Sequence, residues 1–172
     1  MPGVPETVLL VICAVAAVTD WRTGTIPNWL TLPPLVLAPL YFAVTDWPWG
    51  AVRSLLGIFI CSIVPLLLFW RRAMGGGDVK LLAAVGALSG YMLGLEIQLF
   101  ACAIAGLYAL VRLCWDGLLF RTLQNIGRIL LNAVLPKAKR KELDPTLLTS
   151  IRFGGAIFAA AALNIALRTL TA

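Results

Sequence analysis

Two aspartates stand at the ends of apolar stretches, where a charged side chain needs a physical reason. Asp20 closes the first long apolar stretch and Asp78 opens a later one. An acidic side chain within a membrane helix costs about 2.5 to 3.5 kcal/mol on insertion scales. Two carboxyl groups held close together in a partly desolvated place share one proton, which leaves a base beside an acid. Such a pair suffices to hydrolyse a peptide bond with an activated water.

Other catalytic groups are scarce in the sequence. There is no histidine, which excludes Ser-His-Asp and Cys-His catalysis and histidine zinc ligands. The cysteines form no Cys-x-x-Cys pair and all lie in apolar stretches, which favours buried small side chains over metal ligands; they are Cys13, Cys61, Cys102 and Cys114. We therefore expect neither a metal nor a cofactor.

A run of three glycines precedes the second aspartate. Gly75, Gly76 and Gly77 let the backbone approach closely, adopt positive φ and leave room for an extended peptide. Taken alone, the run favours a plain flexible loop that ends in an N-cap aspartate. Lys80 follows, and either it or Arg22 is suited to stabilise an ionised carboxylate. The alternative for Lys80 is simple anchoring of a helix end among lipid headgroups.

The composition indicates the kind of fold that must hold these residues in place. Hydrophobic residues make up 60% of the 172 residues and charged residues 13%, with a mean hydropathy of +0.92. Soluble domains are about half apolar. A membrane-crossing helix needs about 20 apolar residues, so the chain has room for about six spans with short loops. We predict an all-α polytopic membrane helix bundle that forms a single integral membrane domain over residues 1–172.

The apolar pattern places the spans, and one long stretch has to be divided. Residues 79–115 are too many for one crossing, and Ser89, Gly90, Gly94 and Glu96 provide a place to turn. The expected spans are residues 5–20, 29–44, 51–70, 79–94, 97–115 and 153–170.

The region between the last two spans has a different character. Polar residues recur at helical spacing over residues 116–135, which predicts an amphipathic helix lying on the membrane surface. The sequence PKAKRK at 136–141 then predicts a basic loop that contacts anionic lipid of the inner leaflet. Residues 116–152 are thus expected to form an amphipathic segment and a basic cytoplasmic loop.

Basic residues give the orientation. All but two of the 14 Lys and Arg residues fall on one side of this map, the exceptions being Arg53 and Arg168. Lys and Arg accumulate in cytoplasmic loops, so we expect that side to face the cytoplasm and both termini to lie outside. The net charge of +6 is then a membrane-surface feature, and no nucleic-acid partner is expected. An odd-numbered span ends on the same side of the membrane as an even-numbered span begins, so we expect Asp20 and Asp78 to share one membrane face. Three other acidic residues, Glu6, Asp46 and Glu96, are expected on the opposite face.

Two blocks of this sequence resemble the signatures of prepilin peptidases, the type IV leader peptidase family of aspartic peptidases. The first runs from Asp20-Trp21-Arg22 to Ile26-Pro27-Asn28, and the second is GGGDVK at residues 75–80. The resemblance implies that Asp20 and Asp78 are the catalytic pair and that Gly75 and Gly77 are the glycines of a Gly-x-Gly-Asp motif. It also implies site-shaping or substrate-positioning roles for neighbours of the pair, namely Gly76, Lys80, Arg22, Pro27 and Asn28. A third stretch, Phe153-Gly154-Gly155-Ala156, is similar to the family's Phe/Tyr-Gly segment, but Arg152 and Gly155 replace prolines often found there, and no function is assigned to it.

The resemblance also implies an activity. It predicts an endopeptidase at the cytoplasmic face of the inner (cytoplasmic) membrane that removes the short basic leader of a prepilin or prepseudopilin. Long family members insert a Cys-x-x-Cys domain near the first block, and nothing here corresponds to it, so the chain resembles the short Flp/Tad-pilus type. No residues support the N-methylation carried out by the long members, and peptidase activity alone is expected. The rival interpretation is a membrane transporter or assembly subunit that uses both aspartates as a proton relay.

Overall fold

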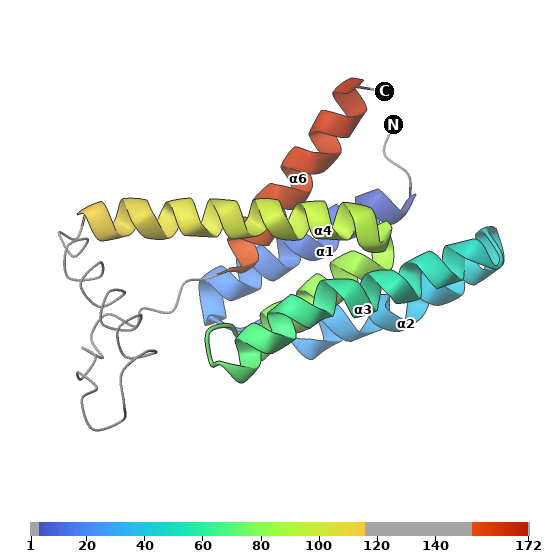
Figure 1. The fold of residues 1–172 in the computed structure, drawn as a ribbon, viewed down its shortest axis with the longest axis horizontal. Coiled ribbons are helices and arrows are strands. Elements are labelled where there is room, and N and C mark those ends of the chain that lie inside the picture. Colours follow the sequence, from blue (N-terminus) through green and yellow to red (C-terminus); the bar gives the residue numbers. More distant parts are fainter. Residues whose placement is uncertain (1–3, 116–152, 172) are drawn as a thin grey trace, which may run out of the picture. The chain divides into compact units, whose positions relative to one another are not determined.

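The computed structural model describes residues 4–115 and 153–171, and all regular secondary structure in these residues is helical (Figure 1). Its elements in chain order are α1 (Val4–Thr23), α2 (Asn28–Thr45), α3 (Trp49–Trp70), α4 (Gly76–Trp115) and α6 (Gly154–Thr171). The predicted all-α fold is confirmed. The predicted surface helix at 116–135 and the basic run at 136–141 lie outside the described residues.

Contacts between residues divide the chain into two compact units. The first comprises Met1–Ile104 and Arg152–Ala172, and the second comprises Ala105–Ile151. Within the second unit the structure describes only residues 105–115, which are helical. All residues of the candidate site lie in the first unit. The expectation of a single domain over residues 1–172 stays a prediction.

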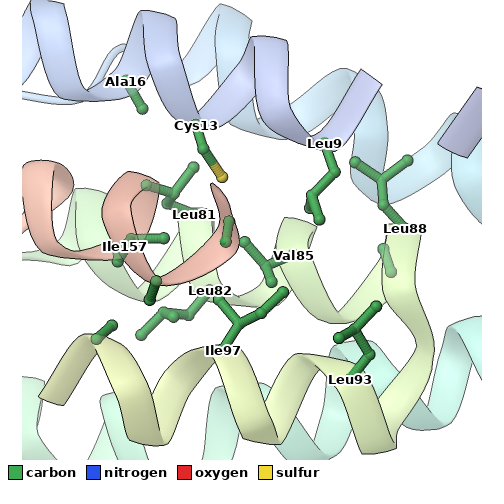
Figure 2. Packing of buried hydrophobic residues seen from close by; sticks show 14 of the residues in the cluster. Leu9, Cys13, Ala16, Leu81, Leu82, Val85, Leu88, Leu93, Ile97 and Ile157 are labelled. Atoms are coloured by element: carbon green, nitrogen blue, oxygen red, sulfur yellow. The ribbon is translucent and has the colours of Figure 1, made fainter. Parts of the chain in front are cut away.

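The fourth element contains the turn that the sequence requires. Gly90 has φ +77 and ψ 176, outside the helical region, so α4 consists of two helical stretches joined at this residue. A Cβ built on Gly94 would lie 3.1 Å from the Cα of Gly86, whereas eight residues of straight helix span about 12 Å. The chain therefore folds back at Gly90, and Figure 2 shows the ribbon turning between Leu88 and Leu93.

This turn corrects the expected number of helices. The described residues form five helical elements and not the six separate helices predicted, because the expected spans 79–94 and 97–115 both belong to α4. The break also comes at Gly90, earlier than the predicted end of the span at Gly94. One glycine at positive φ reverses the chain without a loop, since glycine has no Cβ to forbid that conformation.

Several helices have the length and hydropathy needed to cross a bilayer. Among the described residues these are Asn28–Thr45, Trp49–Trp70 and Gly76–Arg112, and a shorter apolar helix covers Gly154–Leu170. Large apolar side chains also face outward, for example Val36, Phe59 and Leu99 at 62%, 68% and 70% exposure. A water-soluble surface would rarely carry so many of them, whereas a lipid-facing surface requires them. The fold is that of a polytopic membrane protein.

A buried apolar cluster joins α1, α2, α4 and α6. Leu9 and Cys13 of α1, Leu81 and Val85 of α4, and Ile157 of α6 all point into it (Figure 2). Ile97 enters the same cluster from beyond the turn at Gly90. These side chains are less than 2% exposed, so α1, α4 and α6 pack around a tightly filled core that limits their movement.

Small residues bring α3 and α4 close together. A Cβ built on Gly57 would lie 2.0 Å from the carbonyl oxygen of Gly86, and one built on Gly86 would lie 2.2 Å from the carbonyl oxygen of Gly57. Ser54 adds a buried hydrogen bond, its hydroxyl donating to the carbonyl oxygen of Ala87 at 2.7 Å. Glycine contacts and interhelical hydrogen bonds of this kind hold helices together in lipid, where apolar burial gives little. They position the start of α4 relative to α3.

Candidate active site

Asp20 lies in the last turn of α1 and is only 7% exposed. The helix ends just beyond it, where the N–H of Gly24 donates to the Asp20 carbonyl oxygen at 2.9 Å and Gly24 adopts φ +68. Positive φ of this kind is a common way for a helix to stop, and glycine adopts it without strain. The Asp20 side chain accepts a hydrogen bond at Oδ2 from the backbone N–H of Gly154, at 3.0 Å.

Asp78 lies in the first turn of α4 and is partly buried. Its carboxylate accepts a hydrogen bond from the backbone N–H of Gly75, at the end of the loop that precedes the helix. Asp20 is near enough that its charge acts on Asp78. The fold therefore brings together two carboxyl groups that are far apart in the sequence, at an end of the bundle where α1 finishes and α4 begins.

The three glycines before Asp78 meet three different neighbours. A Cβ built on Gly75 would lie 3.1 Å from Asp78 Oδ2, and one on Gly77 would lie 3.0 Å from the Cβ of Ile26. A Cβ on Gly76 would meet the ring of Phe69 at 3.3 Å. The outer two glycines thus touch the carboxyl group and the Ile-Pro-Asn block, whereas the middle one touches a side chain that can rotate.

A second contact links the two sequence blocks. Lys80 Nζ donates a hydrogen bond to Asn28 Oδ1 at 2.8 Å, which joins the start of α4 to the first residue of α2. Pro27 is the N-cap residue of α2, in extended conformation, and directs the chain into that helix. Arg22 is exposed, and within residues 4–115 and 153–171 it forms no ion pair with either aspartate.

Gly154 is the contact that the sequence did not predict. It is the first residue of α6, it is buried, and its N–H points at Asp20 from 134 residues away. The signal in the sequence is the Phe153-Gly154-Gly155 stretch, to which no function is assigned because Arg152 and Gly155 replace prolines often found there. The start of α6 therefore belongs to the site together with α1 and α4.

The arrangement favours proton transfer. Two helices, α4 and α6, begin at the site, and the amide groups of a helix N-terminus favour negative charge nearby. Asp20 and Asp78 each accept one backbone N–H, which leaves further lone pairs for water. Within the described residues, no group of three or more His, Cys, Asp and Glu side chains is placed to hold a metal ion. The expectation of a metal-free site stays a prediction.

An apolar cavity of about 370 Å³ lies elsewhere, between α1 and α2. Its lining includes Ile12, Leu30 and Leu37 but neither aspartate. Its lining is almost entirely apolar and includes no carboxyl group. The carboxyl pair, and not this cavity, is the candidate active site.

The fold and the site together define a class: a polytopic helical membrane protein with two carboxyl groups brought together at helix ends. Within that class, the chain belongs to the type IV leader peptidase family, whose sequence profile matches residues 7–110. The matched segment contains both aspartates, the glycine run, Asn28 and Lys80. It does not contain Gly154.

Three relatives are similar to part of this chain, and each is named prepilin leader peptidase/N-methyltransferase. The Klebsiella pneumoniae protein is 34% identical over 99 residues, which cover 52% of this chain and 43% of that protein. The Bacillus subtilis protein is 28% identical, covering 60% of this chain and 42% of that protein, and the Dickeya chrysanthemi protein is 35% identical, covering 58% and 36%. The chain thus spans less than half the length of these curated relatives. No solved structure matches it.

Proposed function

We propose that the chain is a membrane-embedded aspartic endopeptidase that removes the short basic leader from prepilin or prepseudopilin precursors. The observation that supports this most directly is that Asp20 and Asp78, on different helices and 58 positions apart in the sequence, interact at one end of the bundle. Membership of the leader peptidase family supports the substrate class, since all three relatives are named prepilin leader peptidases. The aspartic mechanism is an inference from the carboxyl pair.

The proposed chemistry needs only the two carboxyl groups and a water. One carboxylate takes a proton from the water, whose oxygen bonds to the carbonyl carbon of the scissile peptide, while the other carboxylic acid gives its proton to the carbonyl oxygen. The C–N bond of the resulting tetrahedral intermediate then breaks as the nitrogen takes up a proton. Close carboxyl groups resist double ionisation, which keeps one proton on the pair at the start of each cycle.

The glycine run gives the substrate room. A peptide bond inside a helix has its backbone groups already hydrogen-bonded, so the cleavage site must unwind before water can attack it. Gly75 is exposed beside Asp78, and it carries no side chain that would block an extended segment there. The apolar part of the precursor would remain in the bilayer while its leader reaches the carboxyl pair at the boundary.

We propose that the site faces the cytoplasm. Near the site end stand Arg22, Arg71 and Arg72, all exposed, as expected of a surface that meets the anionic inner leaflet. The two basic residues assigned to the opposite face are paired with acids, Arg53 with Asp46 and Arg168 with Glu96. Each of these ion pairs is close to neutral, so the difference in positive charge between the two membrane faces is larger. This difference sets the orientation. Both termini would then lie outside.

The proposal extends to peptide cleavage alone and to the short Flp/Tad-pilus type. The relatives' names include an N-methyltransferase activity, but the residues gathered at this site are suited to acid–base chemistry. The chain corresponds to less than half of each relative, so their second activity is not transferred to it. A methylation assay on cleaved product would be expected to show no incorporation.

Co-expression with a pilin precursor tests the function. Asp20→Asn and Asp78→Asn should each leave the precursor uncleaved while the variant still inserts in the membrane at wild-type amounts. Glu6→Gln is a matched control, since this acid belongs to the opposite end of α1. If the two Asn variants process the precursor normally and instead alter proton flux in vesicles, the relay interpretation replaces the peptidase.

A further inference from the structure

The contact between Gly154 and Asp20 has the geometry of a positioning device. The Gly154 N–H donates to Asp20 Oδ2 at 3.0 Å, and the bond is buried. Asp20 lies near the end of α1 in a buried position, 7% exposed, and burial by itself does not fix which way each carboxyl oxygen points. A carboxyl group in such a place can rotate about its side-chain bonds unless something holds it. The N–H at the start of α6 is the contact that does so.

The same position admits no side chain. A Cβ built on Gly154 would lie 3.0 Å from both the Cβ and the Oδ2 atom of Asp20 and 3.3 Å from its Cγ. These distances are shorter than ordinary van der Waals contact, so alanine at this position would push the carboxyl group aside. The next residue, Gly155, is exposed, and a Cβ there would meet nothing within 4 Å. A side chain would therefore be tolerated at position 155 but not at position 154.

We propose that Gly154 is a positioning residue for the reaction: its N–H fixes one oxygen of Asp20, and its lack of a side chain leaves the carboxyl group in the orientation that cleavage requires. This inference rests on the proposed peptidase function. It makes α6 part of the catalytic unit, although α6 lies outside residues 7–110, which the family profile matches. The remaining oxygen of Asp20 is left to engage the attacking water.

The core explains how α6 can hold such a position. Ile157 and Ala161, one and two turns after the glycine, are fully buried and pack in the same cluster as Leu9 and Cys13 of α1. Side chains packed at this density allow small displacements only at a cost in free energy. The N–H of Gly154 is therefore held rigidly, and it holds Asp20 in turn.

Cleavage kinetics of the purified full-length protein with a synthetic precursor peptide test the proposal. Gly154→Ala should lower kcat on the order of 10- to 100-fold, because small misplacements of catalytic groups cost rates of this size. KM should stay within about twofold, since Gly154 is buried and is proposed to act through Asp20 and not on the substrate directly. Gly155→Ala, the matched control, should keep the wild-type kcat and KM. A wild-type kcat for Gly154→Ala, or an equal loss in Gly155→Ala, would overturn the proposal.

A second measurement does not depend on how the alanine variant folds. The sequence contains a single Phe-Gly dipeptide, Phe153-Gly154, so protein labelled with 13C in the phenylalanine carbonyl and 15N in glycine gives one Gly154 amide signal. In the wild type its proton should resonate downfield, as expected for a bond to a carboxylate, and Asp20→Ala should move it upfield. Val11→Ala, which shortens an exposed side chain of α1 outside the buried cluster, is the control and should leave the Gly154 signal near its wild-type position.

The two results separate this inference from the function on which it rests. If Asp20→Asn and Asp78→Asn abolish cleavage but Gly154→Ala does not, the peptidase stands and the positioning role is wrong. A Gly154 amide signal whose position does not change in Asp20→Ala also contradicts the positioning role. If the two Asn variants still cleave, the peptidase proposal itself is wrong, whatever Gly154 does.

Discussion

Lys80 of α4 donates a hydrogen bond to Asn28 of α2 at 2.8 Å, across 52 residues of sequence. This bond joins the residue two positions after Asp78 to the last residue of the Ile-Pro-Asn block. Nearby, Gly77 packs against Ile26 of the same block. The two blocks that define the family resemblance are thus in direct contact, and this contact sets where α4 begins relative to α2.

Lys80 is therefore expected to act through Asn28 and not only as an anchor among headgroups. Lys80→Ala and Asn28→Ala should each lower kcat/KM by about tenfold, which corresponds to about 1.4 kcal/mol. The double variant should be no worse than either single one, because both remove the same bond. Asn28→Asp should keep most activity, since a carboxylate accepts the bond equally well. Full activity in Lys80→Ala would show that the lysine only anchors the helix.

The glycine run is predicted to be sensitive at its outer positions. Gly75→Ala and Gly77→Ala should reduce the cleavage rate strongly, because their methyl groups would press on Asp78 and Ile26. Gly76→Ala should be milder, since the Phe69 ring that it meets can rotate away. Rates of precursor cleavage by the three purified variants give the order. If Gly76→Ala lowers the cleavage rate the most, the contacts of Gly75 and Gly77 do not explain why this run consists of glycines.

The order of the apolar stretches was sufficient to predict that Asp20 and Asp78 lie at the same end of the bundle, whereas their catalytic role stays a prediction. Asp20 ends an element and Asp78 begins a later one, and in a bundle of antiparallel spans such positions share an end whatever the orientation. The opposite end follows by the same rule, and there Arg53 pairs with Asp46 and Arg168 with Glu96. These conclusions needed the order of the apolar stretches and no knowledge of packing.

What could not be predicted depends on contacts between particular faces of helices. Gly154 meets Asp20 because α6 packs along α1, and the order of spans does not say which helices are neighbours. The position of the turn in α4 was ambiguous for a different reason. Ser89, Gly90 and Gly94 all suit a turn by residue type, and only the backbone shows that Gly90 takes the positive φ. The five helical elements replace the six predicted because that turn needs no loop.

The close approach of α3 and α4 predicts a large effect on stability away from the site. Gly57→Ala would place a methyl group about where the Gly86 carbonyl oxygen stands, so the two helices must separate. We expect a loss of about 3 kcal/mol or more in the free energy of unfolding, at the upper end for overpacked cores. Gly155→Ala, where space is open, should leave thermal unfolding in detergent unchanged. An unfolding temperature near that of the wild type for Gly57→Ala would contradict this packing.

Orientation can be checked by accessibility. In a variant without native cysteines, Ala73→Cys labels the exposed loop between α3 and α4 near the site, and Trp47→Cys labels the exposed loop between α2 and α3. A membrane-impermeant maleimide added to intact spheroplasts should react with Cys at position 47 and not at position 73. Inverted vesicles should give the reverse pattern. Reaction at position 73 in spheroplasts and at position 47 in inverted vesicles would place the carboxyl pair outside the cytoplasm.

The central claim is that Asp20 and Asp78 act as one unit, and the rate of precursor cleavage by purified single and double variants tests it most directly. Asp20→Asn, Asp78→Asn and the double variant should all show the same residual rate, because removing either member of a joint acid–base pair removes the whole of its contribution. Measurable cleavage by either single variant, with a further multiplicative loss in the double variant, would contradict the account.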